Sequence, residues 1–285
     1  MSVCCQPACD FSKLVDPAMC PVSSKLTAGA AFRHLDEVIC PAAATSDQRR
    51  PPMRIPLLLV GVILAAVASL HFVHPAVAAA GCPSCYGFTD LGDGIFVQRS
   101  MAPESRDTAK ATIEEARARV RAFYDSLEAH PRVLLCQTDD CYRPLGGSSR
   151  GITLLDQALI LSPRGIDTVI ATHELAHAEL HRRIGLMATL SRSVPQWFDE
   201  GLAVSVSDDP RYLAPASRPD RCRSEPDGDL PTSRTAWIET AQSADLYAKA
   251  ACKVSRWLGS HGGSAGVRRL AAGIADGAAF DVLAN

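Results

Sequence analysis

Two histidines and a glutamate stand at a spacing that suits metal binding and catalysis. His173, Glu174 and His177 form the pattern H-E-x-x-H. On a helix, residues four apart share one face, so both imidazoles can reach one point. Neutral imidazoles are good zinc ligands, and the glutamate between them can act on a water at that metal without binding it. The pattern predicts a Zn2+ site held by His173 and His177, with Glu174 as general base.

The neighbouring His181 is a poor candidate for the third ligand that such a site needs. It lies about 12 Å beyond His173 along a helix that rises 1.5 Å per residue, too far for one ion to bind both easily. The metzincin pattern also fails, because it requires glycine at Leu180 and histidine at Arg183. We therefore expect His181 to face solvent or to support a ligand.

Glu200 is the better third ligand. It lies in the largely apolar run 194–204, where a carboxylate is costly unless it is paired or binds a metal. Ser193 and Gln196 have the spacing of a capping box, so a short helix is expected to present Glu200. The predicted zinc ligands are therefore the two motif histidines and Glu200.

These two motifs together resemble a known family. The run H-E-L-A-H at 173–177, followed by W-F-D-E-G-L-A at 197–203, resembles the gluzincin branch of the zinc metallopeptidases, the peptidase-MA-like group. The resemblance is strongest over 167–205. It implies an α+β, zincin-like fold in which a small mixed sheet packs on the motif helix. It also implies a peptide or protein substrate, zinc bound by the histidines and Glu200, and Glu174 as the base.

One position departs from the family pattern. Thermolysin-like gluzincins carry an aspartate four residues after the ligand glutamate, where it orients a histidine, and Val204 stands there in this chain. The orienting group is then expected to be Asp199 or a backbone carbonyl. Tyr247 resembles the phenol that stabilises the oxyanion in some gluzincins, although its pattern favours a packed core residue.

Composition narrows the class of protein. The chain has 285 residues, 47% of them apolar and 21% charged, with a formal net charge of −2. This apolar fraction is typical of a globular protein with a sizeable core. No basic run with interleaved aromatic residues is present, so nucleic acid is not an expected partner.

The stretch 53–80 has the features of a secretory signal. Residues 55–70 carry no charge, arginines precede them, and three alanines end at Ala80. The uncharged run is shorter than the roughly 20 residues that span a bilayer. This signal begins at Met53 rather than Met1, so residues 1–52 are expected to be an untranslated or disordered upstream extension.

Two alternatives remain for this N-terminal part. Residues 1–52 could be a cytoplasmic tail before an uncleaved signal anchor. Cys82 could be lipidated, because the preceding alanines and glycine resemble a lipobox, although the pattern prefers Leu, Val or Ile at Ala79. Membrane contact is expected only through 55–80 or such a lipid. In every case the part from 81 onward is exported, to a bacterial periplasm or the cell exterior.

Six cysteines follow residue 81, and an even number in an exported chain predicts disulfides. Many pairings are possible, and proximity along the chain favours three of them. A redox or zinc role for the first pair is disfavoured, because no second pair stands at zinc-finger spacing. The favoured bonds are Cys82–Cys85, Cys136–Cys141 and Cys222–Cys252.

Residues 81–285 are expected to form one domain, with a catalytic core at 131–206, an irregular loop at 207–233 and a helical part at 234–285. The loop is expected either to rim the cleft or to be an incidental surface insertion. Two other classes of function stay open: a non-proteolytic zinc protein of the same fold, and a membrane-tethered scaffold.

The expected elements are a hairpin or strand in 86–100, a helix from Pro103 to about Ala129, strands at 132–136, 152–155 and 158–161, a turn region at 137–151, the motif helix between Ser162 and Gly185, and helices at 233–258 and 264–275.

Overall fold

The structure is a computed structural model. It describes residues 59–63, 74–218, 220–240 and 245–285. The chain divides into two units between Pro52 and Met53, and every described residue belongs to the second. The expected extension 1–52 lies outside the described residues, and so does most of the expected signal 53–80. Within the described ranges, no helix is long and apolar enough to cross a bilayer.

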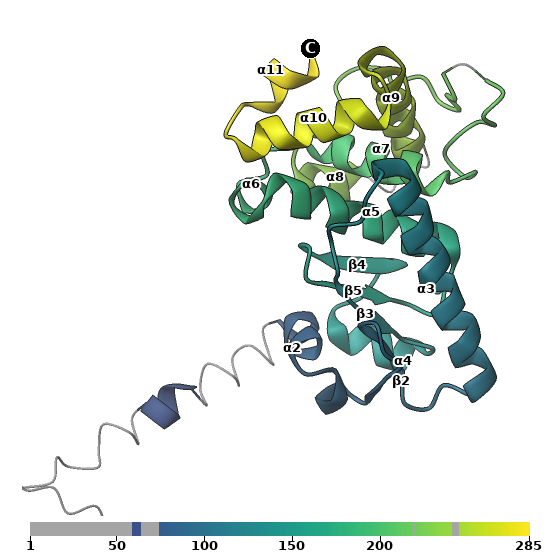
Figure 1. Cartoon of the computed structure of the whole chain (residues 1–285), viewed down its shortest axis with the longest axis vertical. Coiled ribbons are helices and arrows are strands. Elements are labelled where there is room, and N and C mark those ends of the chain that lie inside the picture. The colour runs from purple at the N-terminus through teal and green to yellow at the C-terminus, as the bar shows by residue number, and fades with distance from the viewer. Residues whose placement is uncertain (1–58, 64–73, 219, 241–244) are drawn as a thin grey trace, which may run out of the picture. The chain divides into compact units, whose positions relative to one another are not determined.

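A five-stranded mixed sheet forms one part of this unit, in the order β1-β2-β3-β5-β4 (Figure 1). Strands β2, β3 and β5 run parallel, while β1 and β4 are antiparallel edge strands. The expected hairpin and the three expected strands are all present. The strands are β1 (Phe88–Asp90), β2 (Ile95–Gln98), β3 (Arg132–Leu135), β4 (Gly151–Leu154) and β5 (Ala158–Leu161).

Helices cover both faces of the sheet and form the C-terminal part, so the fold mixes helices with a small sheet, which is consistent with the expected α+β class. The α-helices are α2 (Pro75–Gly81), α3 (Pro103–Tyr124), α4 (Asp139–Tyr142), α5 (Thr168–Ile184), α6 (Leu186–Leu190), α7 (Gln196–Ser207), α8 (Arg234–Thr240), α9 (Leu246–His261), α10 (Ser264–Ala275) and α11 (Phe280–Ala284). The described residues also contain the 3-10 helices η1 (Pro83–Tyr86) and η2 (Arg143–Leu145).

The central strands β3 and β5 are apolar because both of their faces are buried. Val133 and Leu159 point into the main core with α3 and α5. Leu134 and Ile160, one residue further along each strand, point into a second cluster that contains Ala79 of α2. The alanines expected at the exit of the signal thus belong to a helix that packs on the sheet.

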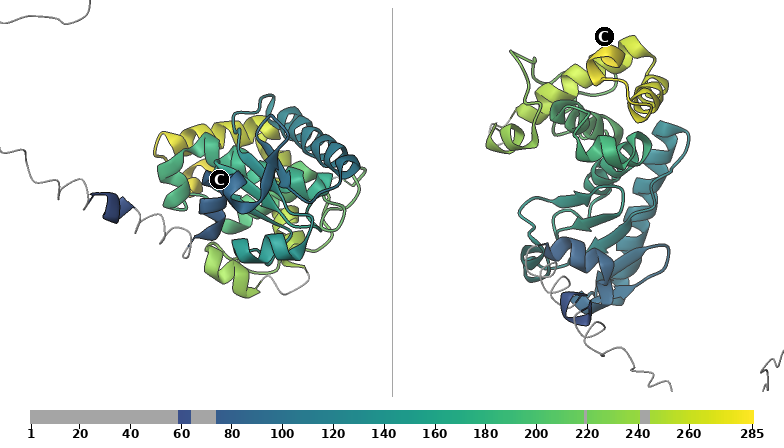
Figure 2. Two further views of the ribbon diagram at one scale, coloured as in Figure 1. Left: turned by 90° about the horizontal axis from the view of Figure 1, so that it is seen from below. Right: turned by 90° about the vertical axis from the view of Figure 1, so that its left-hand side faces the viewer.

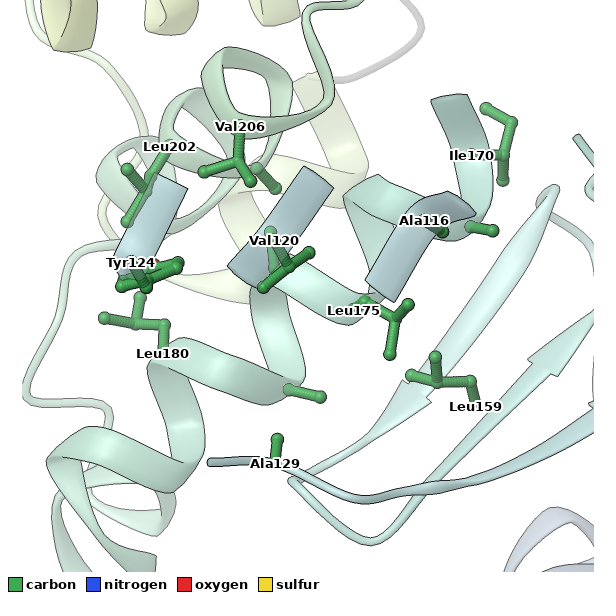
Figure 3. Packing of buried hydrophobic residues seen from close by; sticks show 14 of the residues in the cluster. Ala116, Val120, Tyr124, Ala129, Leu159, Ile170, Leu175, Leu180, Leu202 and Val206 are labelled. Atoms are coloured by element: carbon green, nitrogen blue, oxygen red, sulfur yellow. The ribbon is translucent and has the colours of Figure 1, made fainter. Parts of the chain in front are cut away.

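The motif helix α5 lies between this sheet and the C-terminal helices (Figure 1, and Figure 2, right). Side chains from α3, α5, α7 and β5 meet in the main core (Figure 3). Among them, Leu175 and Leu180 of α5 are fully buried, as are Val120 of α3 and Leu202 of α7. The helix that carries the histidines is therefore held on several sides by packed apolar residues.

The start of α5 differs from the expectation. It begins after Asp167, whose carboxylate accepts hydrogen bonds from the backbone N–H groups of Val169 (2.9 Å) and Ile170 (3.2 Å). The expected start at Ser162 was wrong because this stronger N-cap follows it. Gly185, with a positive φ of 83° that favours glycine, ends the helix as predicted.

Helix α3 ends at Tyr124, several residues before the expected end. Asp125 adopts the left-handed conformation there, with φ 61°. The buried carboxylate of Glu179 then accepts hydrogen bonds from the backbone N–H groups of Glu128 (3.0 Å) and Ala129 (2.8 Å). A side chain of α5 therefore satisfies backbone groups that a longer α3 would have used.

Helix α7 is capped differently from the prediction. The expected capping box between Ser193 and Gln196 does not form, since no side chain caps this helix. Its first two N–H groups donate instead to the carbonyls of Thr232 (2.9 Å) and Pro231 (3.2 Å). The end of the loop 207–233 thus closes the N-terminus of the helix that carries Glu200.

Two further stretches differ from the expectation. The single helix expected at 233–258 is two helices, α8 and α9, and the expected turn region 137–151 contains α4 and η2. The helix expected at 264–275 is confirmed as α10.

The three favoured disulfides are confirmed: the S–S distances are 2.00 Å for Cys82–Cys85, 2.00 Å for Cys136–Cys141 and 1.92 Å for Cys222–Cys252. Cys82 is therefore bonded to Cys85 in this structure.

Candidate metal centre

Three ligand atoms from α5 and α7 converge on one point. Nε2 of His173 lies 3.1 Å from Nε2 of His177. Oε2 of Glu200 lies 3.4 Å from the first nitrogen and 3.6 Å from the second. All three side chains are largely buried. These residues, the ligands expected from the sequence, form a group that could hold a metal ion.

Close helix packing brings Glu200 to the histidines. The two histidines lie one helical turn apart on α5, and α7 packs directly against that helix. Gly201, next to Glu200, permits α9 to lie against the other side of α7. A Cβ at this position would stand 2.5 Å from the carbonyl oxygen of Ala250, closer than a real Cβ comes. The absence of a side chain at Gly201 therefore helps to set the position of the ligand beside it.

The Glu200 carboxylate is held in its ionised form. Burial opposes ionisation, but the close imidazoles of His173 and His177 overcome it and lower the pKa of Glu200 to about 2. The side-chain amide of Gln196 donates to Oε1 at 3.0 Å. The other oxygen is left facing the imidazoles, so the glutamate presents an anionic ligand atom.

Asp199 orients one of the two histidines. Its Oδ1 lies 2.7 Å from Nδ1 of His177. Burial opposes ionisation here too, but the contacts with His177 and His181 hold the pKa of Asp199 well below its usual range. Because Nδ1 of His177 donates to this anion, its Nε2 can present a lone pair to a metal ion bound between the ligands. The group expected to orient a ligand histidine was either Asp199 or a backbone carbonyl, and for His177 the structure has Asp199 in this role.

His181 lies beside the centre but outside the ligand group. Its Nε2 contacts Oδ2 of Asp199 at 3.3 Å, and its Nδ1 contacts the carbonyl oxygen of Leu155 at 3.3 Å. It therefore supports Asp199, which in turn supports His177. This was one of the two roles expected for it.

Glu174 faces the same cavity without joining the ligands. Thr153 of β4 donates its hydroxyl to Oε2 of Glu174 at 2.6 Å. Gly151 of the same strand allows the carboxylate to approach, since a Cβ there would stand 2.6 Å from the Glu174 side chain. The edge strand β4 thus positions the predicted base from the side opposite α7.

A cavity of about 610 Å³ joins these groups. Its walls include the ligands, Glu174, all of β4 except its last residue, and Trp237 and Tyr247. The Tyr247 ring packs against Tyr212 and Trp237 at centroid distances of 5.1 Å, and lies 6.5 Å from the ring of His173. Burial, followed by the nearby Glu200, raises the pKa of Tyr247, which keeps its phenol protonated. Tyr247 is thus packed and also lines the cavity.

Sequence reasoning missed three of the residues that hold the site. Thr153 and Gly151 support Glu174, and Gln196 supports Glu200. A capping role was assigned to Gln196 because only its spacing from Ser193 was visible. The two β4 residues carry no local signal, since their contact with α5 depends on how the strand packs on the helix.

Comparisons with protein-family models, with curated proteins and with solved structures found no match for this chain.

Proposed function

We propose that the protein is an exported zinc-dependent metallohydrolase, a peptidase of the gluzincin type on a zincin-like fold. The observation that carries the proposal is the group of His173, His177 and Glu200, with Glu174 beside it and not among the ligands. A protein that used a metal only for structure would have no need of a carboxylate held in that place.

The donor set and its dimensions favour zinc. Two imidazoles and one carboxylate are a frequent ligand set of catalytic zinc, which keeps a fourth position open. Zinc bound tetrahedrally at roughly 2.05 Å separates its ligand atoms by about 3.3 Å. The three separations here, 3.1, 3.4 and 3.6 Å, lie on both sides of that value.

A zinc ion held by His173, His177 and Glu200 would supply Lewis acidity toward a water and toward the carbonyl group of a substrate. Glu174 takes a proton from the water as its oxygen attacks the carbonyl carbon. It then passes the proton to the nitrogen that leaves when the C–N bond breaks. Thr153 keeps the carboxylate in place during both transfers. Tyr247, protonated and half-buried, can donate a hydrogen bond to the carbonyl oxygen as negative charge develops there.

The edge strand β4 suits a peptide substrate. It pairs only with β5, so its other edge is unpaired within the sheet. Gly151, Ile152 and Thr153 of this strand line the cavity that contains Glu174. An extended peptide can add to such an edge through main-chain hydrogen bonds. This would place its backbone beside the base and the metal ligands.

The three disulfides support an oxidising compartment. Together with the signal-like segment 53–80, they support export.

The test combines metal analysis with peptide hydrolysis on the full-length protein. We expect one zinc per chain, and cleavage of members of a peptide library. Glu174→Gln should reduce kcat by about a thousandfold, within the range for loss of a general base, while the zinc content stays unchanged. Glu200→Ala should lose the zinc. The matched control is Glu115→Gln, on the exposed face of α3, which should leave both readouts unchanged.

Each failure has a distinct meaning. Full zinc content with no cleavage of any peptide would favour a zinc protein without peptidase activity. Cleavage that persists in Glu174→Gln would refute the role of Glu174 as base. Zinc retained by Glu200→Ala would refute the ligand assignment.

A further inference from the structure

A second cavity, of about 240 Å³, adjoins the candidate metal centre. It shares part of its wall with the first cavity: Thr153, His181, Gln196, Asp199 and Arg234 line both. A peptide in the first cavity could therefore place a neighbouring side chain or its terminus in the second.

Part of the wall of this second cavity is apolar, although polar groups make up the larger share of its lining. Leu180 and Ile184 come from the end of α5, Leu190 from α6, and Val194 from the segment before α7. Methylene groups of a side chain can pack against such a wall.

Two exposed arginines supply the charge of this cavity. Arg192 and Arg234 both line it. Within the described part of the chain, neither guanidinium has a hydrogen bond or ion pair. Among the described residues that line the cavity, the one carboxylate is Asp199, which is already bonded to His177 and His181. Within the described ranges, neither cation is therefore paired with a carboxylate in this second cavity.

The backbone at Arg192 adds a second observation. This residue follows α6 in the left-handed conformation, with φ 55°, where glycine is the favoured residue. Glycine would suit this backbone turn better, so the turn itself gives no reason for an arginine side chain here.

We infer that this second cavity is a substrate subsite that selects a carboxylate close to the scissile bond. The carboxylate is either an acidic side chain or the carboxy terminus of the peptide. Planar guanidinium groups recognise carboxylates through paired hydrogen bonds, and the apolar part of the wall accepts the methylenes that precede the carboxylate. The inference rests on the proposed peptidase function, and it names the substrate class of that site.

The test uses pairs of peptides that differ only in Glu or Gln at one position, from two residues before the scissile bond to two after it. Each peptide is made with a free and with an amidated carboxy terminus. For the wild-type protein, we expect Glu in place of Gln at one position, or a free in place of an amidated terminus, to raise kcat/KM about tenfold. The effect is modest because both arginines are exposed. The double variant Arg192→Gly/Arg234→Gln should bring this ratio close to one.

Controls separate loss of the charge from loss of the fold. Arg119→Gln changes a partly exposed arginine of α3 that is paired with Glu115, and it should keep the wild-type ratio. Arg192→Gly alone suits the local backbone, so it should keep the melting temperature while it lowers the ratio by about threefold, half of the tenfold effect on a logarithmic scale.

A binding measurement makes the result independent of turnover. The zinc-loaded Glu174→Gln protein is titrated with the same peptide pairs. A Glu preference in binding that the double variant loses would support the subsite, even if no peptide were cleaved and the proposed peptidase function had failed. A ratio of one in the wild type, or a ratio that the double variant keeps, would overturn the subsite whether or not peptides are cleaved.

Discussion

Replacing Asp199 by asparagine should weaken zinc binding without removing a ligand. The carboxylate accepts a 2.7 Å hydrogen bond from His177 and carries a full negative charge, since its pKa lies well below the usual range. Hydrogen bonds to charged groups contribute about 1.5–3 kcal/mol, against roughly 1 kcal/mol for neutral ones. An amide keeps an acceptor but loses the charge, so the difference is about 1.4 kcal/mol, or tenfold in affinity.

The zinc affinity of wild-type and Asp199→Asn protein can be compared by titration against a competing chelator. Melting temperatures of the metal-free proteins show whether the fold is intact. Asp156→Asn is a matched control, because this carboxylate lies near α5 but pairs with Arg182, at 3.7 Å, and not with a ligand. It should change the zinc affinity less than twofold.

His181 provides the sharper comparison. It contacts Asp199 through a longer separation, 3.3 Å, so His181→Gln should lower the affinity only about threefold, less than the tenfold effect of losing the carboxylate charge itself. His173→Ala should abolish tight binding. An Asp199→Asn protein with wild-type affinity and an intact fold would refute the orienting role. Loss of tight binding in His181→Gln would show that His181 is a ligand.

Two other changes test how the fold supports the site. Gly151→Ala would place a Cβ 2.6 Å from the Glu174 side chain, so kcat should fall about a hundredfold with zinc affinity within about threefold of wild type. Its control is Gly259→Ala in α9, where no atom lies within 4 Å of the new Cβ, and which should raise stability by about 0.5–1 kcal/mol. Replacing Cys222 and Cys252 by serine removes a disulfide between residues 30 apart in sequence. The free energy of unfolding should fall by about 3.5 kcal/mol, which is measured as a lower denaturant midpoint. An unchanged midpoint would contradict this.

The features that could be predicted from sequence are those set by local spacing. Strands β3 and β5 are short apolar runs, and their burial on both faces explains the pattern that predicted them. His173 and His177 meet because residues four apart share a helix face in any helix. Glu200 was predicted from its cost in an apolar helix, and its carboxylate does lie with the histidines.

The features that could not be predicted depend on contacts between distant segments. Helix α3 stops early because Glu179 of α5 bonds the backbone after it. Helix α7 starts without a side-chain cap because the carbonyls of Pro231 and Thr232 accept its first N–H groups. The spacing of nearby residues carries no information about such partners. Helix ends were therefore the elements predicted least well.

The site consists of two parts that different elements hold in place. The ligands come from α5 and α7, and Asp199 and Gln196, both on α7, hold them from within that pair of helices. Glu174 comes from α5, but β4 positions its carboxylate: Thr153 donates a hydrogen bond to it, and Gly151 leaves the room that it occupies. Metal affinity and hydrolysis should therefore respond to different substitutions. A change on β4 that lowered zinc affinity as much as it lowered hydrolysis would show that strand and helices move as one body, and that this division is wrong.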